Sequence, residues 1–222
     1  MRHWLKENRG FLLFLACFGL FRTAVADWNP IPSGSMRPSL LEGDVVLVNR
    51  LAYDLKLPLT DRVLARLGEP ARGDIVTFSS PADGTRLIKR VIALPGDLIE
   101  MRDNALVING EAVAYQPIAR IDEPLSDGGA LPGAQWNEQL PGRTHVVQLI
   151  DGAMARGNFG PVTVPDGHYL MLGDNRDLSA DSRVFGFVAR ERLIGRAHRI
   201  LVSADILGDW APRLARWGRA LI

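Results

Sequence analysis

The chain has one lysine and one serine-bearing turn whose surroundings suit nucleophilic catalysis. Of its 26 Lys and Arg residues only three are lysine, and Lys89 lies within the apolar run 87–92 (LIKRVI). Arginine stays charged, whereas a buried lysine can lose its proton and act as a base. Upstream, residues 32–36 (PSGSM) offer a serine on a turn that the proline stiffens and Gly34 permits. Because a serine hydroxyl needs an adjacent base, the two segments predict a serine–lysine hydrolase.

A third segment, residues 173–183 (GDNRDLSADSR), is rich in charged and amide side chains and predicts a polar loop. Read alone, it is compatible with a solvated turn or with a calcium-like cluster of aspartates. Arg176 and Arg183 argue against a cation site, because they would repel the ion. The chain has one cysteine and no His-x-x-x-His pair, so we expect no metal site and no cofactor.

These segments must be positioned by a fold that reads as mainly β. Gly (22 residues) and Pro (14) are abundant, and Asn109-Gly110 is a strong hairpin signal. Alternation within the run 86–94 places Lys89 on one face with Leu87 and Val91. The segment 53–67 has helix-like spacing interrupted by Pro58, which predicts a loop with at most a short helix. The predicted strands cover residues 44–49, 74–78, 86–94, 105–108, 144–150, 168–172 and 193–202.

Length and charge narrow the class of protein. A chain of 222 residues is long enough for one large domain, or for one domain with an insertion. The formal net charge of +1 argues against a nucleic-acid partner. Cys17 is the only cysteine, so no intramolecular disulfide can form.

The N-terminus predicts targeting to a membrane. A basic segment over 1–10 precedes an apolar run over 11–21 and then Arg22. One interpretation is a cleaved signal peptide ending at residues 24–26 (AVA); the other is an uncleaved anchor, with Arg22 near the outer face. Both predict that the basic end is cytoplasmic and that the rest of the chain is exported.

Two stretches stand apart from the strands. Residues 116–143 are rich in Pro, Gly and Asp and predict a surface excursion. From Trp210 onward the spacing predicts an amphipathic helix, which either packs on the sheet or rests on anionic lipid. Its apolar face would carry Trp210, Leu214, Trp217 and Leu221, with Arg213, Arg216 and Arg219 off that face.

The three polar segments, in this order, resemble those of bacterial signal peptidase I. The serine segment is residues 33–40 (SGSMRPSL), and the lysine segment is 72–76 (RGDIV) followed by 88–91 (IKRV) and 94–97 (LPGD). The last segment is 173–183 followed by Gly186. The resemblance covers roughly residues 28–203 and leaves 116–160 unmatched. It implies a mainly β, signal-peptidase-like catalytic domain of short coiled sheets behind an N-terminal transmembrane helix.

The resemblance also implies roles for individual residues. Ser35 is the expected nucleophile and Lys89 the general base. Ser33 would donate to the oxyanion hole beside the backbone N–H of Ser35. Ser179 would hydrogen-bond the Lys89 amine. Asp181 and Arg183 would form the ion pair that supports this loop.

The expected substrate is an exported preprotein cleaved after small residues at the last and third-last positions of its signal peptide. The resemblance places Ile31, Leu40, Ile88 and Ala180 at or beside a shallow apolar pocket that excludes bulky side chains. The substrate would pair with strand edges in an extended form. Arg37 adds a charge beside the serine turn. This is a departure from the family pattern, and the charge can bias substrate choice.

The resemblance favours an uncleaved anchor over a cleaved leader. We therefore expect a cytoplasmic segment over 1–10, a transmembrane anchor over 11–27 and an exported catalytic domain over 28–222, with 116–160 as a variable excursion. This arrangement predicts a single-pass protein of the bacterial inner membrane, with lipid and preproteins as partners and its catalytic domain outside the cytoplasm. The oligomeric state stays open.

Three alternatives remain at this point. A histidine could replace Lys89 as base, but His3, His145, His168 and His198 share no motif with a serine. A dedicated maturation peptidase for a pilin or a conjugation protein would have the same motifs. A membrane-anchored β-domain that binds peptides without cutting them would have the same fold, because fold does not establish function.

Overall fold

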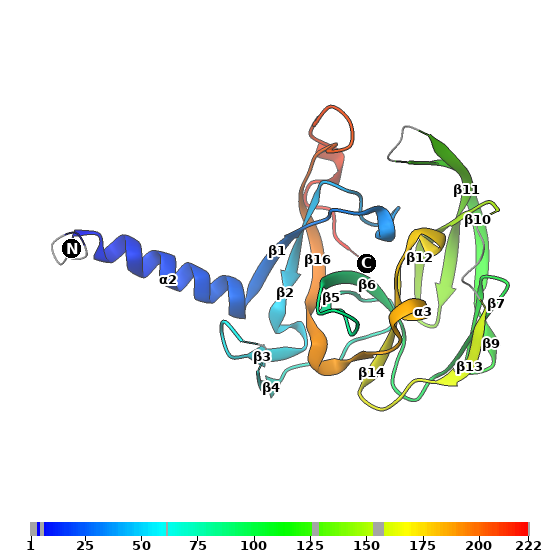
Figure 1. Cartoon of the computed structure of the whole chain (residues 1–222), viewed down its shortest axis with the longest axis horizontal. Coiled ribbons are helices and arrows are strands. Elements are labelled where there is room, and N and C mark those ends of the chain that lie inside the picture. Colours follow the sequence, from blue (N-terminus) through cyan, green and yellow to red (C-terminus); the bar gives the residue numbers. More distant parts are fainter. Residues whose placement is uncertain (1–3, 5–6, 61, 126–128, 153–157, 222) are drawn as a thin grey trace.

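The computed structural model describes residues 4, 7–60, 62–125, 129–152 and 158–221 and shows a mainly β protein with one long helix. Figure 1 shows a body of twisted sheets from which the N-terminal helix projects on one side. Half of the expected cytoplasmic segment 1–10, namely residues 1–3, 5 and 6, lies outside the described residues.

The central sheet brings the serine turn and the lysine strand together. The turn follows the edge strand of this sheet, and Lys89 lies in an inner strand opposite Val76. All but three residues of the lysine strand are buried, which explains its β-branched, apolar composition. In spatial order the sheet consists of β1 (Ala26–Pro30), β2 (Asp44–Asn49), β16 (Leu193–Ser203), β5 (Ile75–Ser79), β6 (Arg86–Ala93), β14 (His168–Leu172) and β15 (Val188–Ala189).

A second region is built from two smaller antiparallel sheets. Asn109 and Gly110 both have positive φ, as the predicted hairpin between β8 and β9 requires. The three-stranded sheet contains β10 (Ala114–Pro124), β11 (Ala130–Leu140) and β12 (Arg143–Ile150). The four-stranded sheet contains β13 (Phe159–Thr163), β7 (Leu98–Arg102), β8 (Ala105–Ile108) and β9 (Glu111–Ala112).

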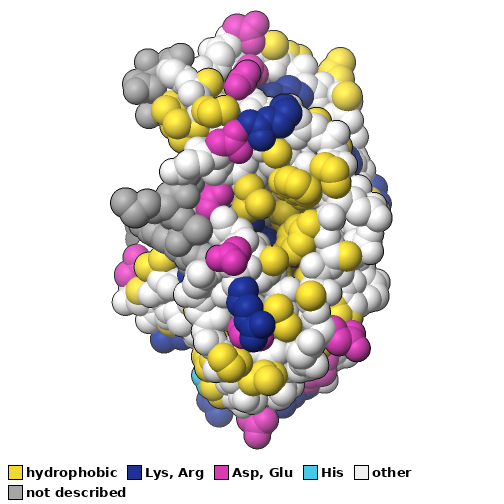
Figure 2. Space-filling model, turned by 90° about the vertical axis from the view of Figure 1, so that its right-hand side faces the viewer, with side chains coloured by type: hydrophobic (Ala, Val, Ile, Leu, Met, Phe, Trp, Pro, Cys, Tyr) yellow, Lys and Arg dark blue, Asp and Glu magenta, His cyan; other side chains and the backbone are white. Residues whose placement is uncertain are grey.

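The outer side of this second region is partly apolar. Figure 2 shows apolar side chains gathered in a band down the face on the side opposite α2, with charged side chains beside them. Leu98, Ile118 and Val162 are exposed on strands of this region. Isolated exposed apolar side chains are common on soluble proteins, so this band by itself assigns no partner.

Two stretches differ from the sequence predictions because of long-range backbone pairing. Residues 116–143 are not a loose excursion: β10 and β11 pair over ten positions, and a register shift after Pro117 accommodates the proline. The segment 53–67 forms the hairpin of β3 (Asp54–Lys56) and β4 (Val63–Arg66) after the short turn η2 (Arg50–Ala52), with Pro58 in its loop. Backbone hydrogen bonds to a partner strand overrode the local composition in both cases.

The C-terminal stretch is not an amphipathic helix. It is extended except for one 3₁₀ turn, η5 (Leu214–Arg216), and runs back along β16. Ala204 pairs with Pro212 and Arg199 with Ala220 as isolated bridges, so the last part of β16 and the residue after it supply the hydrogen bonds that a helix would have made internally. Figure 1 shows the C-terminus lying between the central sheet and the second region.

The N-terminal helix α2 covers Arg9–Ala24 and has no buried residue. It ends before residue 27, the expected end of the anchor, because the chain enters β1 at Ala26. Among the described residues, none of the helices combines the length and apolarity needed to span a bilayer. Arg22 does not point freely outward: its Nε lies 3.0 Å from Asp27, and its guanidinium lies 4.4 Å above the Trp28 ring.

Candidate active site

The serine turn is a single tight 3₁₀ turn, η1 (Gly34–Met36), held by the apolar core beneath it. Met36 and Leu40 are fully buried, and the backbone N–H of Leu40 donates to the Met36 carbonyl at 2.9 Å. Burial of side chains of this size contributes about 1.5–3 kcal/mol each. Ser35, immediately before Met36, is only half-buried. The turn therefore presents one hydroxyl from a rigid base.

The side chains of Lys89 and Ser35 meet directly. Lys89 Nζ lies 2.5 Å from Ser35 Oγ, and Lys89 is 3% exposed. Burial lowers the pKa of Lys89 to about 8, against the smaller opposing effects of the Asp181 and Asp174 charges. A lysine with this pKa has a significant neutral fraction near neutral pH, so it can accept a proton from the hydroxyl.

An ion pair between Asp181 and Arg183 supports the wall beside Lys89. The two side chains are 2.7 Å apart, and Asp181 also accepts from the Gly173 backbone N–H at 3.1 Å. Asp181 caps the short helix α3 (Ser182–Phe185). Burial works against ionisation of Asp181, but the hydrogen bond and charge of Arg183 hold its pKa below the usual range. The predicted pairing of these two residues is therefore present.

Gly173 allows this loop to pass close to the serine turn. A Cβ placed there would lie 2.5 Å from the Ser35 carbonyl oxygen and 2.2 Å from Ser179 Oγ. Any larger residue at position 173 would push the two segments apart.

A second buried ion pair fixes the lysine strand to the same loop. Arg90 Nε and Nη2 each lie 2.8 Å from an oxygen of Asp174, and both side chains are 1% exposed. Burial disfavours the charged carboxylate, but Arg90 holds the pKa of Asp174 below the usual range. Removing one partner of such a pair costs about 3–5 kcal/mol. The ion pair of Arg90, the residue that follows Lys89 on β6, therefore fixes the position of Lys89 relative to the loop.

The second region adds two acidic residues that the sequence analysis missed. Glu138 on β11 is fully buried and lies 2.6 Å from Arg176 Nη2. Glu123 on β10 accepts from Asn175 Nδ2 at 3.1 Å, and the same amide group donates to the Gly34 carbonyl at 3.1 Å. Nothing in the sequence indicated these acidic partners. The 173–183 segment contains three aspartates and two arginines, so its arginines could be assumed to pair within the segment.

Two further predicted site residues, Ser179 and Ser33, have hydroxyls that make no hydrogen bond to the residues the structure describes. Ser179 is buried beside Gly173, yet its Oγ has no hydrogen-bond partner among the described residues, so the predicted bond to Lys89 is not formed. Ser33 precedes η1 in an extended conformation, is exposed, and its hydroxyl makes no bond to a described residue. Its backbone position leaves the hydroxyl available to a bound group.

The predicted pocket residues divide into a buried set and an exposed one. Ile31, Leu40 and Ile88 lie in one apolar cluster under the serine turn. Leu40 is fully buried, so it supports the turn from beneath. It does not line an open pocket, which differs from the sequence prediction. Ala180 is exposed and lies outside this cluster.

No described histidine is hydrogen-bonded to Ser35. His145 is buried, and its Nε2 lies 3.3 Å from Glu138 and 3.7 Å from Asp174. Burial lowers the pKa of His145 to about 4, so the ring is neutral at physiological pH. His168 contacts only the backbone of its own turn, and His3 lies outside the described residues.

Comparisons with known proteins find similar sequences among bacterial signal peptidases. The chain is 38% identical over 211 residues to a signal peptidase I of Pseudomonas fluorescens, covering 90% of this chain and 72% of the relative. It is 35% identical over 222 residues to a signal peptidase I of Rickettsia typhi, covering 91% of this chain and 82% of the relative. A crystal structure of a signal peptidase I from Enterococcus faecalis is 31% identical, covers 58% of this chain and 96% of its own, and has a TM-score of 0.36.

The family match extends over nearly the whole chain. The model of the family described as signal peptidase, peptidase S26, matches residues 1–202, which include the serine turn, the lysine strand and the 173–183 loop. On this match and the identities to its curated relatives, the chain belongs to the signal peptidase family S26.

Proposed function

We propose that this protein is a serine endopeptidase that removes N-terminal signal peptides from exported preproteins, with Ser35 as nucleophile and Lys89 as general base. The observation that carries the assignment of roles is the 2.5 Å contact between a buried lysine amine and a half-buried serine hydroxyl. The family membership supplies the reaction class.

In the first half of the reaction, neutral Lys89 accepts the Ser35 proton while Oγ attacks the scissile carbonyl carbon. The negative charge that develops on the carbonyl oxygen is stabilised by the Ser35 backbone N–H and the Ser33 hydroxyl. The C–N bond then breaks, and protonated Lys89 gives its proton to the leaving amine, which becomes the N-terminus of the mature protein.

In the second half, Lys89 is again neutral and accepts a proton from water, which attacks the Ser35 ester. Collapse of this intermediate breaks the ester bond, and Lys89 returns the proton to Ser35 Oγ. The ion pair of Asp181 and Arg183 holds the loop beside Lys89, and Ser179 completes its wall.

Substrate choice follows from the apolar cluster next to the turn. Ile31 and Ile88 present an apolar surface close to Ser35 and Lys89, with Leu40 filling the space beneath. A surface with this backing receives a small side chain and excludes a bulky one, which supports cleavage after small residues. Ala180, exposed on the 173–183 loop, is proposed to contact the same substrate side chain from outside this cluster.

The N-terminal segment is proposed as a retained single-pass anchor in the bacterial inner membrane, with the catalytic domain on the extracytoplasmic side. The apolar residues of α2 are exposed, as lipid contact would require. Arg22 and Trp28 lie together where the helix joins the domain, which suits the headgroup region of a bilayer. Tethering enzyme and preprotein to one surface would raise their effective concentration.

The test is cleavage of a purified preprotein with a small-x-small site by the detergent-extracted protein. The wild type should cut at that site, and Ser35→Ala and Lys89→Ala should not. Cleavage by both wild type and Lys89→Ala would refute the lysine base. A folded wild type that cuts no preprotein would refute the proposed activity and favour a dedicated maturation peptidase or a peptide-binding domain.

A further inference from the structure

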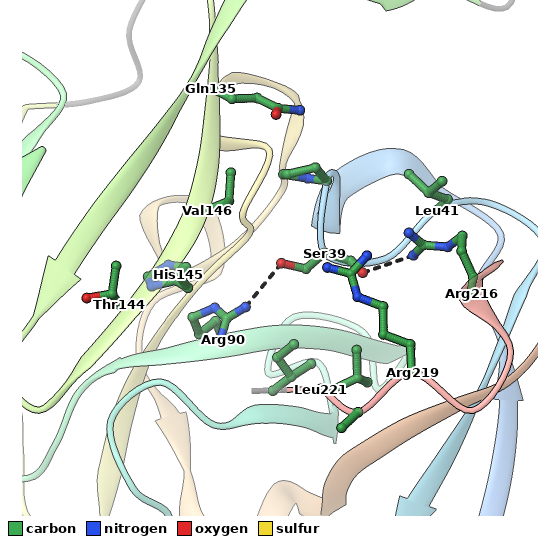
Figure 3. Close-up of a pocket in the computed structure, with 13 residues that line it drawn as sticks. Ser39, Leu41, Arg90, Gln135, Thr144, His145, Val146, Arg216, Arg219 and Leu221 are labelled. Carbon is green, nitrogen blue, oxygen red and sulfur yellow. Dashed lines mark hydrogen bonds between the residues drawn. The ribbon is translucent and has the colours of Figure 1, made fainter. Parts of the chain in front are cut away.

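A pocket of about 530 Å³ with both polar and apolar walls lies on the Arg90 side of β6, between the central sheet and the second region. Figure 3 shows its walls: Ser39 from the segment after the serine turn, His145 from β12, and Arg216 and Arg219 from the C-terminal segment. The mechanism above uses none of the open space in this pocket.

The pocket has an excess of positive charge. Arg90, Arg216 and Arg219 all line it, and no acidic residue does. Arg90 is neutralised by Asp174, and Arg216 by Asp44 at 2.6 Å. The Arg219 side chain is exposed and makes no ion pair or hydrogen bond with any residue that the structure describes, and Figure 3 shows it directed toward Ser39.

Two further polar side chains border the pocket. His145 is 6% exposed, and its Nε2 already faces the buried carboxylates of Glu138 and Asp174. The side chain of Gln135 also lines the pocket. Of the three arginines that line the pocket, Arg90 and Arg216 are paired with carboxylates, so the Arg219 guanidinium is the group that would receive an anion.

The pocket lies within reach of a bound substrate. Ser39 is four residues from Ser35 in the sequence, so the two residues are at most about 14 Å apart. Arg90 is the neighbour of Lys89 on β6. Since an extended peptide advances about 3.3 Å per residue, the pocket is reachable from within the first four or five residues beside the cut.

The opposite side of the serine turn has a different character. A pocket of about 630 Å³ there is lined by Ile31, Pro32, Trp210 and Trp217 and has almost no polar surface. A signal peptide is apolar on its side of the cut, so the apolar pocket matches that side. We therefore expect the arginine-lined pocket to face the mature part of the preprotein.

We propose that this pocket is a subsite for an acidic side chain, Asp or Glu, within the first five residues of the mature protein, and that Arg219 is its specificity-determining residue. The inference rests on the proposed function. It also assigns a role to the C-terminal segment, whose Trp210 and Trp217 border one pocket and whose Arg216 and Arg219 border the other.

The experiment measures kcat/KM on peptides that contain a small-x-small site and carry Asp, Asn or Lys at each of the first five positions after it. The wild type should cut the best-placed Asp peptide about three to ten times faster than the matched Asn peptide at low salt. Salt should weaken this preference because Arg219 is exposed. Arg219→Gln should remove the preference, Arg219→Lys should keep most of it, and Arg219→Glu should shift the preference to Lys.

The matched control is Arg66→Gln, which removes another exposed arginine from β4 and should keep the Asp preference. Equal rates for Asp and Asn peptides at all five positions in the wild type would overturn the subsite, as would an Asp preference that survives in Arg219→Glu. Cleavage of the Asn peptide by every variant establishes that the proposed function stands independently. If no peptide is cut by the wild type, the proposed function fails and the subsite fails with it.

Discussion

The central sheet and the second region contribute to the same site in different ways. The central sheet supplies the reacting groups on short local motifs, Ser35 on a turn and Lys89 on a strand. The second region supplies Glu123 and Glu138, which touch neither group but hold the 173–183 loop between them. Reacting residues can be read from a motif, whereas the residues that hold them in place are dispersed along the chain.

The largest expected effect comes from the dyad itself. Ser35→Ala and Lys89→Ala should each reduce kcat by about 10⁴-fold or more, as losses of a nucleophile or base do in other serine hydrolases. Lys89→Arg is the matched control for charge: it keeps a cation but cannot serve as a base, so it should be equally inactive. Single-turnover cleavage of a preprotein measures all three, and activity in Lys89→Arg would contradict base catalysis.

The next effect tests whether the second region is structurally essential. Glu138→Gln leaves Arg176 buried without a full counter-charge and should lower the free energy of unfolding by about 3–5 kcal/mol. Urea denaturation of the full chain in detergent measures it. Glu111→Gln, on the exposed strand β9, is the control and should change it by less than about 0.5 kcal/mol. Equal stabilities for the two variants would mean that residues 116–143 are a dispensable excursion after all.

A smaller effect is expected at Glu123, which acts through Asn175 on the serine turn. Glu123→Gln should lower kcat about tenfold and leave KM nearly unchanged, because it weakens the contacts of this carboxylate with Asn175, Gln148 and Arg37, which lie away from the substrate. The inflection in the pH–rate profile should not move. A change confined to KM would instead place Glu123 in substrate binding.

The smallest effect is the pH dependence of the wild type. Lys89 must be neutral to accept a proton, and its pKa is lowered by burial to about 8. The neutral fraction, and with it kcat/KM, should rise about tenfold between pH 7 and pH 9 and then level off. A pH–rate profile on a peptide substrate measures this rise. Continued increase beyond pH 10 would show that Lys89 is exposed and titrates like a free lysine.

Much of the central sheet could be predicted because its signals are local. Its strands over 44–49 and 168–172 have the predicted bounds, as does the strand over 105–108 in the second region, since alternation and flanking turn residues define them directly. The segment 53–67 and the C-terminal stretch were predicted wrongly. Their periodicity was helical, but a partner strand or a sheet edge was available, and pairing with it outweighed the local preference.

The candidate site shows the same division. The three polar segments and the expected proton transfer between a serine and Lys89 could be predicted from residue types and order alone, because the chemistry requires those types. The burial that lowers the Lys89 pKa depends on the fold, and so do the ion pairs across 38 and 84 positions of sequence that hold the loop and the strand.

The sequence by itself therefore determined which residues can react and where most strands of the central sheet begin and end. Only the tertiary structure decided that Glu123 and Glu138 reach the loop, that Leu40 is buried beneath the turn, and that Arg219 faces an arginine-lined pocket. The physical reason is that turn and strand preferences act over a few residues. Burial and ion pairing depend on segments that meet only when the chain is folded.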